Sequence, residues 1–333
     1  LLVRRGRRFE IVAGHAADAA LLERAAGRVR AARAARCLRG LRAVRIGEAF
    51  AGMGDFAVPA ALLSERFDIT VETRTVGELA AITARVGDNR VEQELAADRT
   101  RFDCQAPPDV HRRSVRLGLG VRDLLDAGGF TAFSANFQAF DTPDEPLCTV
   151  PFLEISKAMA RGVGYGGEGD VLTASLLAAC LQAWEQATFT EMFCPDWAGG
   201  SLFLSHMAEV NPAVLAGRPV LREKDYPFSA AQNPAFVTGP WKTGPATLVN
   251  LAPGPDASFR LLVAPVEILP DGTHPAMAAA IRAWARPALP LPAFLETYSR
   301  HGGTHHCALV RGTHAEAMRA LAGWLGLEAI VIE

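Results

Sequence analysis

The sequence has no long apolar run, almost no net charge and no closely spaced pair of cysteines. No stretch approaches the roughly 20 apolar residues that a membrane-spanning helix needs, and the start has no signal-peptide pattern. We therefore expect a cytoplasmic protein with no membrane partner. The 34 lysines and arginines nearly balance the 36 aspartates and glutamates, which gives a formal net charge of -2. This balance argues against a nucleic-acid partner.

The six cysteines show neither a C-x-x-C pair nor the spacing of a disulfide scaffold, so we expect reduced thiols. Cys194 and Cys307 lie close in sequence to the candidate metal ligands described below. Thiolate ligands favour a closed zinc site. We therefore place these two cysteines at the wall of a pocket and not on a metal.

The chain has 333 residues, half of them apolar, and we expect it to bury a large core in two domains after a connecting segment. In that segment, residues 1–40, the pattern predicts a strand at residues 9–12 and a helix at about residues 16–37. Residues 41–186 alternate strands with helices, which predicts an α/β domain with a doubly wound, Rossmann-like parallel sheet. Residues 187–333 have recurrent prolines, glycines and short apolar runs, which predict a mixed domain with an antiparallel β-barrel or sandwich and helices.

Three side chains that can bind metals lie at the ends of apolar segments, where α/β proteins present ligand groups. Glu168 lies in a glycine run just before an apolar helix predicted for residues 170–186, near the positive end of that helix. Glu191 follows a short predicted strand that ends at the Cys194-Pro195-Asp196 turn. His206 ends a second apolar run. These positions predict that the three side chains are ligand groups.

A histidine pair, His305 and His306, follows two glycines and precedes another apolar run. Adjacent residues of a strand point to opposite faces, so we expect one of the two to be a ligand. Together with Glu168, Glu191 and His206, this gives two carboxylates and two imidazoles. Such a set suits Mn²⁺, Co²⁺, Fe²⁺ or Zn²⁺ and leaves coordination positions open for a polyhydroxy substrate. Taken alone, Glu168 is typical of a helix N-terminus and His206 of a buried core histidine, so the prediction rests on the combination.

The glycine run at residues 164–169 also matches G-x-G-x-x-G, the dinucleotide-binding pattern. That pattern requires a strand directly before it. Residues 154–161 predict a helix instead. We therefore expect no nucleotide cofactor at this position.

Four motifs, in this order, resemble the L-arabinose isomerase family within the wider arabinose and fucose isomerase group: GYGGEGDVLTASL, TFTEMF, LSHMAEVNP and GGTHHC. Further segments, such as RIGE at residues 45–48 and EAIVIE at residues 328–333, extend the similarity nearly from end to end. The resemblance implies a site for Mn²⁺, with Co²⁺ or another divalent metal as a substitute. The ligands that it implies are Glu168, Glu191, His206 and His306.

The same resemblance implies an aldose-ketose isomerase that acts on an open-chain pentose or hexose, of the L-arabinose to L-ribulose type, through an ene-diol. Glu168 and Glu191 are then also the catalytic acid and base, while His206 and His306 are ligands only. The phrase TEMFCPDW and the spacing of the two glutamates depart from the usual family pattern, so the sugar stays open. L-fucose or another sugar is an alternative substrate, and a non-catalytic sugar-binding paralogue is an alternative function.

The resemblance also bears on assembly and on the extent of the chain. It implies a homo-oligomer, either a trimer or a hexamer, whose other partner is a small sugar. It further implies that residues 1–40 form the end of an N-terminal domain and that the chain lacks most of that domain.

Overall fold

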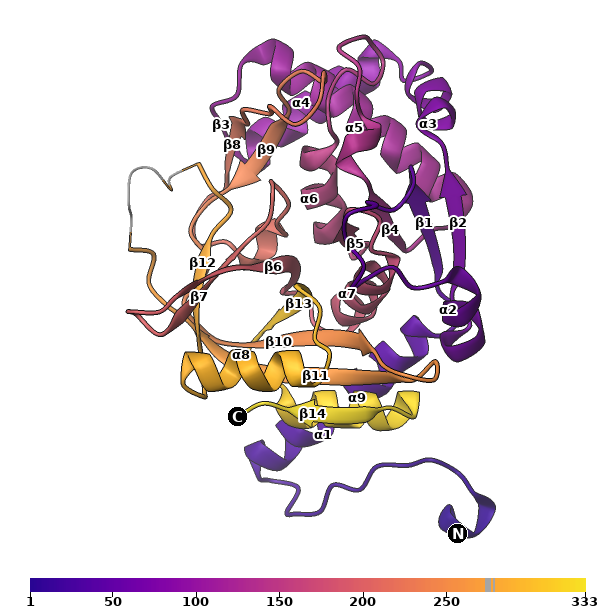
Figure 1. Ribbon diagram of the computed structural model, residues 1–333, viewed down its shortest axis with the longest axis vertical. Coiled ribbons are helices and arrows are strands. Elements are labelled where there is room, and N and C mark those ends of the chain that lie inside the picture. The colour runs from indigo at the N-terminus through magenta and orange to yellow at the C-terminus, as the bar shows by residue number, and fades with distance from the viewer. Residues whose placement is uncertain (273–276, 278) are drawn as a thin grey trace.

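The computed structural model describes residues 1–272, 277 and 279–333. A four-stranded parallel sheet and a closed antiparallel barrel form its two halves, and helix α7 (Val171–Ala183) packs against both (Figure 1). The predicted fold class, a doubly wound parallel sheet followed by an antiparallel barrel with helices, is confirmed. The predicted domain boundary after residue 186 stays a prediction.

The parallel sheet has the strand order β2-β1-β4-β5. Its strands are β1 (Arg42–Ile46), β2 (Thr70–Arg74), β4 (Ala132–Ala135) and β5 (Gly164–Gly167). Ala43, Val44 and Ile46 in β1 are fully buried, as expected for a parallel strand covered on both faces. Because the strands are parallel, their carboxyl ends share one edge of the sheet. The loops after β1, β4 and β5 therefore meet there, and hydrogen bonds join them.

Helices surround this sheet, and some of them begin or end at recognisable capping residues. They are α1 (Ala19–Leu38), α2 (Ala60–Phe67), α3 (Val76–Thr83), α4 (Asp88–Arg101), α5 (Pro108–Gly128) and α6 (Phe152–Ala160). Thr75 and Glu78 form a capping box at the start of α3. Gly129 ends α5 with a φ of 61°, a left-handed conformation that favours glycine. Within the described part of the chain, no helix is long and apolar enough to cross a membrane.

The barrel has the strand order β10-β13-β6-β7-β12-β11, and pairing of β10 with β11 closes it. Its strands are β6 (Ala187–Asp196), β7 (Ser201–Ser205), β10 (Gly244–Pro253), β11 (Phe259–Ile268), β12 (Ala283–Pro287) and β13 (His306–Arg311). Strand β14 (Glu328–Val331) pairs with β11 in parallel. Helices α8 (Leu291–Arg300) and α9 (Ala315–Leu325) pack beside the barrel. A separate small sheet contains β3 (Asp103–Cys104), β8 (Val220–Glu223) and β9 (Ala235–Thr238).

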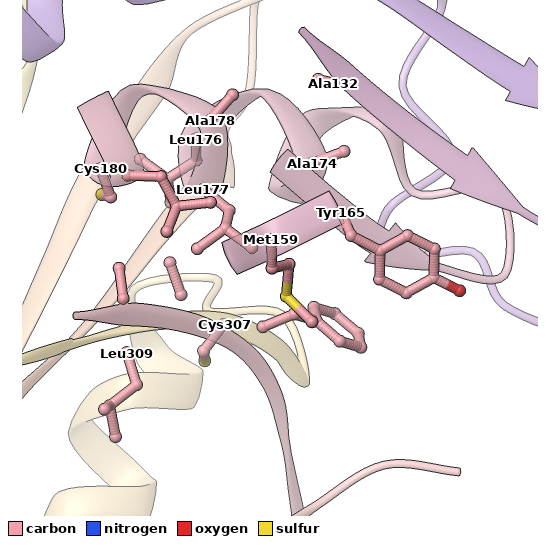
Figure 2. Packing of buried hydrophobic residues seen from close by; sticks show 14 of the residues in the cluster. Ala132, Met159, Tyr165, Ala174, Leu176, Leu177, Ala178, Cys180, Cys307 and Leu309 are labelled. Carbon is pink, nitrogen blue, oxygen red and sulfur yellow. The ribbon is translucent and has the colours of Figure 1, made fainter. Parts of the chain in front are cut away.

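Helix α7 connects the two halves because nearly all of its surface is apolar and buried. It packs on β4 and β5 of the parallel sheet and on β6, β10 and β13 of the barrel. Figure 2 shows side chains of α7 in one buried cluster with Cys307 and Leu309 of β13. The glycines of β5 permit close contact: a Cβ on Gly164 would lie 2.1 Å from the Ala174 carbonyl oxygen, and one on Gly166 would lie 2.2 Å from that of Asp170.

The G-x-G-x-x-G match is thereby explained without a nucleotide. The helix predicted before it is present as α6, the first two glycines of the pattern lie in β5, and Gly169 lies in the turn between β5 and α7. In the dinucleotide-binding pattern the glycines follow a strand and start a helix. Here the first two form the strand surface against which α7 packs.

Two local predictions were wrong. Residues 9–12 form no strand, and Ile11 is 73% exposed, because none of the strands that the structure describes pairs with this segment. The strand that carries Glu191 ends at Asp196, but residues 194–196 belong to the strand itself and the turn follows at residues 197–200. Strand β6 continues through Asp196, paired with β7 beyond a bulge between Met192 and Cys194, because the bulge lets the ladder resume. All six cysteines are free thiols, as expected.

Candidate metal centre

Glu168 lies in the turn between β5 and α7, at the carboxyl edge of the parallel sheet. Its φ is 60°, a left-handed conformation that costs a residue other than glycine roughly 1–3 kcal/mol and is concentrated at functional sites. Ser134 holds this turn, since its hydroxyl accepts the Gly169 N–H at 2.8 Å. The Glu168 side chain is only 11% exposed. Burial raises the pKa of its carboxyl group, against the opposing charge of His206.

His306 is the first residue of β13 and is completely buried. Its Nδ1 lies 3.1 Å from Oδ2 of Asp170, and this acceptor favours the tautomer with the proton on Nδ1. Its Nε2 is buried without a hydrogen-bond partner among the described residues, and a carboxylate oxygen of Glu168 lies 3.7 Å away. Burial lowers the pKa of His306 to about 4 despite the charge of Asp170. The imidazole is therefore neutral at neutral pH, the form that binds metals.

His206 follows β7 and is held by a buried carboxylate. Its Nδ1 lies 2.7 Å from Oε2 of Glu209. Glu209 is 2% exposed and also accepts hydrogen bonds from the Tyr165 hydroxyl at 3.1 Å and from the Ala208 N–H at 2.8 Å. Burial by itself would lower the pKa of His206, but the charge of Glu209 and its hydrogen bond raise it to about 9. A Cβ on Gly167 would lie 2.8 Å from Nε2 of His206, so the glycine lets this nitrogen approach β5.

Glu191 is placed by strand register. In the barrel, Glu191 on β6 pairs with His306 on β13 and with Ser205 on β7, the residue before His206. Directly paired residues have Cβ atoms about 4.5–5.5 Å apart. The register therefore sets Glu191 beside both histidines, and its side chain is half-buried.

The structure brings the candidate ligands together unevenly. Glu168, His305 and His306 each offer a ligand atom within 4.8 Å of the others, whereas Glu191 and His206 are outside this compact group. The rings of His206 and His306 are nevertheless neighbours, with centroids 5.3 Å apart. The ring of His305 lies 4.3 Å from that of His306. The rule that adjacent strand residues point to opposite faces did not identify which of the two histidines is the ligand. His305 precedes β13 and does not belong to the strand, so the rule does not apply to it.

Three carboxylates at this site were missed by the sequence analysis: Asp170, Glu209 and Asp55. Each accepts from an imidazole Nδ1, on His306, His206 and His305 respectively. For the first two there was a usable signal, since an acidic residue stands two or three positions after a candidate ligand. For Asp55 there was none, because 250 positions separate it from His305.

These residues fit a divalent cation. Metal-bound imidazoles commonly donate their second N–H to a carboxylate, which orients the ring and fixes the tautomer. His206 and His306 both have this arrangement. An unsatisfied buried nitrogen costs about 1–3 kcal/mol, and a cation beside Nε2 of His306 would remove that cost.

Known proteins resemble this chain along nearly its whole length. A family model for the L-arabinose isomerase central domain matches residues 42–184, and one for the L-arabinose isomerase C-terminal domain matches residues 186–328. The L-arabinose isomerase of a Nocardioides strain is 30% identical over 99% of this chain and 67% of its own length. Those of Clostridium beijerinckii and Geobacillus kaustophilus are each 27% identical, over 97% and 99% of this chain and 66% and 68% of theirs.

These matches assign the chain to the class of aldose-ketose isomerases. Within that class, it belongs to the L-arabinose isomerase family, as the motifs predicted. The chain spans about two thirds of the length of these relatives.

Proposed function

We propose that this protein is a metal-dependent aldose-ketose isomerase that converts an open-chain sugar, of the L-arabinose to L-ribulose type, through an ene-diol. Glu168, Glu191, His206 and His306 hold the metal, which is Mn²⁺ or, as a substitute, Co²⁺ or another divalent ion. The observation that carries this proposal is the buried Nε2 of His306, which has no hydrogen-bond partner within the described part of the chain and lies 3.7 Å from the Glu168 carboxylate. The cytoplasmic location and the homo-oligomeric state stay predictions.

The reaction moves a proton between C2 and C1 of the sugar while negative charge develops on its oxygens. A bound divalent cation supplies electrostatic stabilisation of that charge. Glu168 approaches from the parallel sheet and Glu191 from the barrel, so the two carboxylates reach the sugar from different halves of the molecule. One takes the proton from C2 and the other delivers a proton to C1, while transfer of the O2 hydroxyl proton to O1 through the same two groups returns each to its starting protonation state. The raised pKa of Glu168 suits a group that must both accept and release a proton.

Two carboxylates orient the imidazoles throughout this reaction. Asp170 keeps the proton of His306 on Nδ1, and Glu209 does the same for His206. In His306 Nε2 is then the nitrogen left for the metal, and in His206, whose raised pKa keeps both ring nitrogens protonated at neutral pH, a cation would displace the proton on Nε2. The two histidines therefore act as ligands and carry no proton between the sugar carbons.

The test measures bound metal and aldose-ketose conversion on one preparation with added Mn²⁺, across a panel of pentoses and hexoses. Metal with turnover is the expected result, and the sugar with the highest kcat/KM identifies the substrate. Glu191→Gln should lower kcat by about 10²–10⁴-fold at saturating Mn²⁺, since that is the usual contribution of a general acid or base. Glu185→Gln, a nearby exposed carboxylate, is the matched control and should keep full activity.

Three results would contradict the proposal. Absence of bound metal would remove the site itself. Bound metal without conversion of any sugar would favour a sugar-binding protein. Full activity of Glu191→Gln would remove its role as acid or base.

A further inference from the structure

The loop after β1, residues 47–59, crosses the candidate site, and we call it the strap. It begins at the carboxyl end of β1 and ends at α2. The Phe50 N–H donates to the carbonyl oxygen of Glu168 at 2.9 Å, and the Asn136 amide donates to the carbonyl oxygen of Glu48 at 2.8 Å. A Cβ on Gly169 would lie 2.5 Å from Cα of Ala49, so the strap backbone lies directly on the Glu168 turn.

Beyond these anchors the strap reaches the barrel. Oδ2 of Asp55 accepts two hydrogen bonds from His305, from its backbone N–H at 3.2 Å and from Nδ1 at 2.7 Å. The next residue, Phe56, is 3% exposed and stacks on the His306 ring, with centroids 4.8 Å apart and planes at 9°. The strap therefore touches Glu168 through its backbone and both histidines of the pair through side chains.

The two hydrogen bonds that Asp55 accepts determine the tautomer and the orientation of the His305 ring. A carboxylate that accepts from Nδ1 keeps the proton on that nitrogen and leaves Nε2 free. The second bond, from the backbone N–H, fixes the carboxylate itself. A surface ion pair of two mobile side chains contributes little, but here Asp55 holds both the backbone and the ring of one residue. His305 also lies within the compact group that contains Glu168 and His306.

We propose that Asp55 is a positioning residue: through His305 it directs a third imidazole nitrogen, Nε2, toward the sugar that binds next to the metal position between Glu168 and His306. Phe56 covers the face of His306 and excludes water from it. Nε2 of His305 then exchanges a hydrogen bond with a sugar hydroxyl, which adds to recognition without adding a metal ligand. The contact with sugar rests on the proposed isomerase function, whereas the control of the His305 tautomer by Asp55 does not.

A double-mutant cycle tests the coupling. Asp55→Ala should lower kcat/KM by about 10–100-fold, the usual effect of losing a carboxylate behind a site histidine, while Mn²⁺ affinity stays within about twofold. Asp55→Ala combined with His305→Gln should be no worse than His305→Gln alone, because Asp55 acts through His305. Asp55→Glu should restore part of the loss. Glu48→Gln, on the same strap with a side chain that is 83% exposed, is the control and should match the wild type.

A second readout does not depend on turnover. In protein loaded with diamagnetic Zn²⁺, long-range ¹H–¹⁵N spectra of the neutral His305 ring should show its proton on Nδ1. The His305→Gln spectrum assigns the signal. In Asp55→Ala the Nδ1–H population should fall, while it should persist in Glu48→Gln.

Several outcomes would overturn the inference. Additive losses in the double mutant would show that Asp55 acts elsewhere, and wild-type kcat/KM in Asp55→Ala would show that it does not act at all. An unchanged His305 tautomer in Asp55→Ala would remove the positioning role. If the wild type turns over no sugar but the tautomer changes as expected, the isomerase proposal fails and the Asp55–His305 coupling stands.

Discussion

At the scale of single residues, Asp170 serves the fold and the site at once. Its Oδ1 accepts the Thr173 N–H at 2.8 Å and caps α7, which is worth about 1 kcal/mol. Its Oδ2 lies 3.1 Å from Nδ1 of His306. The start of the central helix and the orientation of a candidate ligand therefore depend on one carboxylate. A mutation here would disturb both, so a loss of metal binding in that variant alone would not identify its cause.

Gly166 offers a cleaner prediction at this scale. A Cβ at this position would lie 2.2 Å from the Asp170 carbonyl oxygen and 2.9 Å from the Ala174 amide nitrogen, both backbone atoms that cannot move independently. Gly166→Ala should therefore lower the free energy of unfolding by about 1–3 kcal/mol through overpacking. Chemical denaturation measures the change.

The matched control for this prediction is Gly323→Ala on the exposed side of α9. A Cβ there meets no atom within 4 Å. Alanine is favoured over glycine inside a helix by about 1 kcal/mol, so this variant should be more stable. Equal effects of the two substitutions would contradict the close packing of α7 on β5.

At the scale of elements, a largely buried ionic network joins α4, α5 and α6. Lys157 of α6, 4% exposed, contacts Glu94 and Asp98 of α4. Arg122 of α5 lies 3.0 Å from Glu94 and from Glu154. Loss of one partner leaves a buried charge uncompensated, which is costly. The network therefore makes the packing of these helices sensitive to acid.

The expected pH dependence follows from Glu94. Burial by itself raises the pKa of Glu94, but Arg122 and Lys157 outweigh it and lower the pKa from 4.5 to about 2. Because the folded-state pKa lies below the unfolded-state pKa, the stabilisation is complete above about pH 4.5 and is lost as the pH falls toward 2. With screening by solvent, we expect a loss of about 1–2 kcal/mol.

The measurement compares the free energy of unfolding of the wild type and of Glu94→Gln over this range. The wild type should be more stable above pH 4.5, and the difference should shrink as the pH falls. Other carboxylates are present in both proteins, so their contributions cancel in the difference between the two free energies of unfolding. A constant difference across the range would show that Glu94 is not the titrating group.

At the scale of the whole molecule, the candidate ligands come from both halves. Glu168 belongs to the edge of the parallel sheet, whereas Glu191, His206 and His306 belong to the barrel. An ion that binds the folded protein and not the unfolded chain adds stability according to its concentration and affinity. On the proposed function, the metal therefore also ties the sheet to the barrel.

Removal of metal should accordingly lower the unfolding temperature. At a Mn²⁺ concentration of about 100 times Kd, the expected stabilisation is about 2.7 kcal/mol. Calorimetry with Mn²⁺ and then with excess chelator measures the shift. His306→Ala should show no difference between the two conditions, and a wild type that unfolds at the same temperature in both would contradict the four-ligand site.

The sequence by itself determined the class of fold and the kinds of residue at the site. The fold class could be predicted because it depends on the local spacing of apolar residues, prolines and glycines. That spacing indicated alternating strands and helices in the first half and short strands in the second, and the structure has both. The motifs around Glu168, Glu191, His206 and His306 were sufficient to identify the family. Residues 9–12 failed because a strand needs a partner, which local pattern does not reveal.

The tertiary structure alone decided how the imidazoles are held. Asp170 and His306 are 136 positions apart, and Asp55 and His305 are 250 apart. Such pairs depend on barrel closure, on strand register and on the path of the strap across the sheet edge, none of which has a local signature. Periodicity records which face of an element is buried, but not which distant element covers it. The pairing of Asp170 with His306 and of Asp55 with His305 therefore emerged only when the chain was folded.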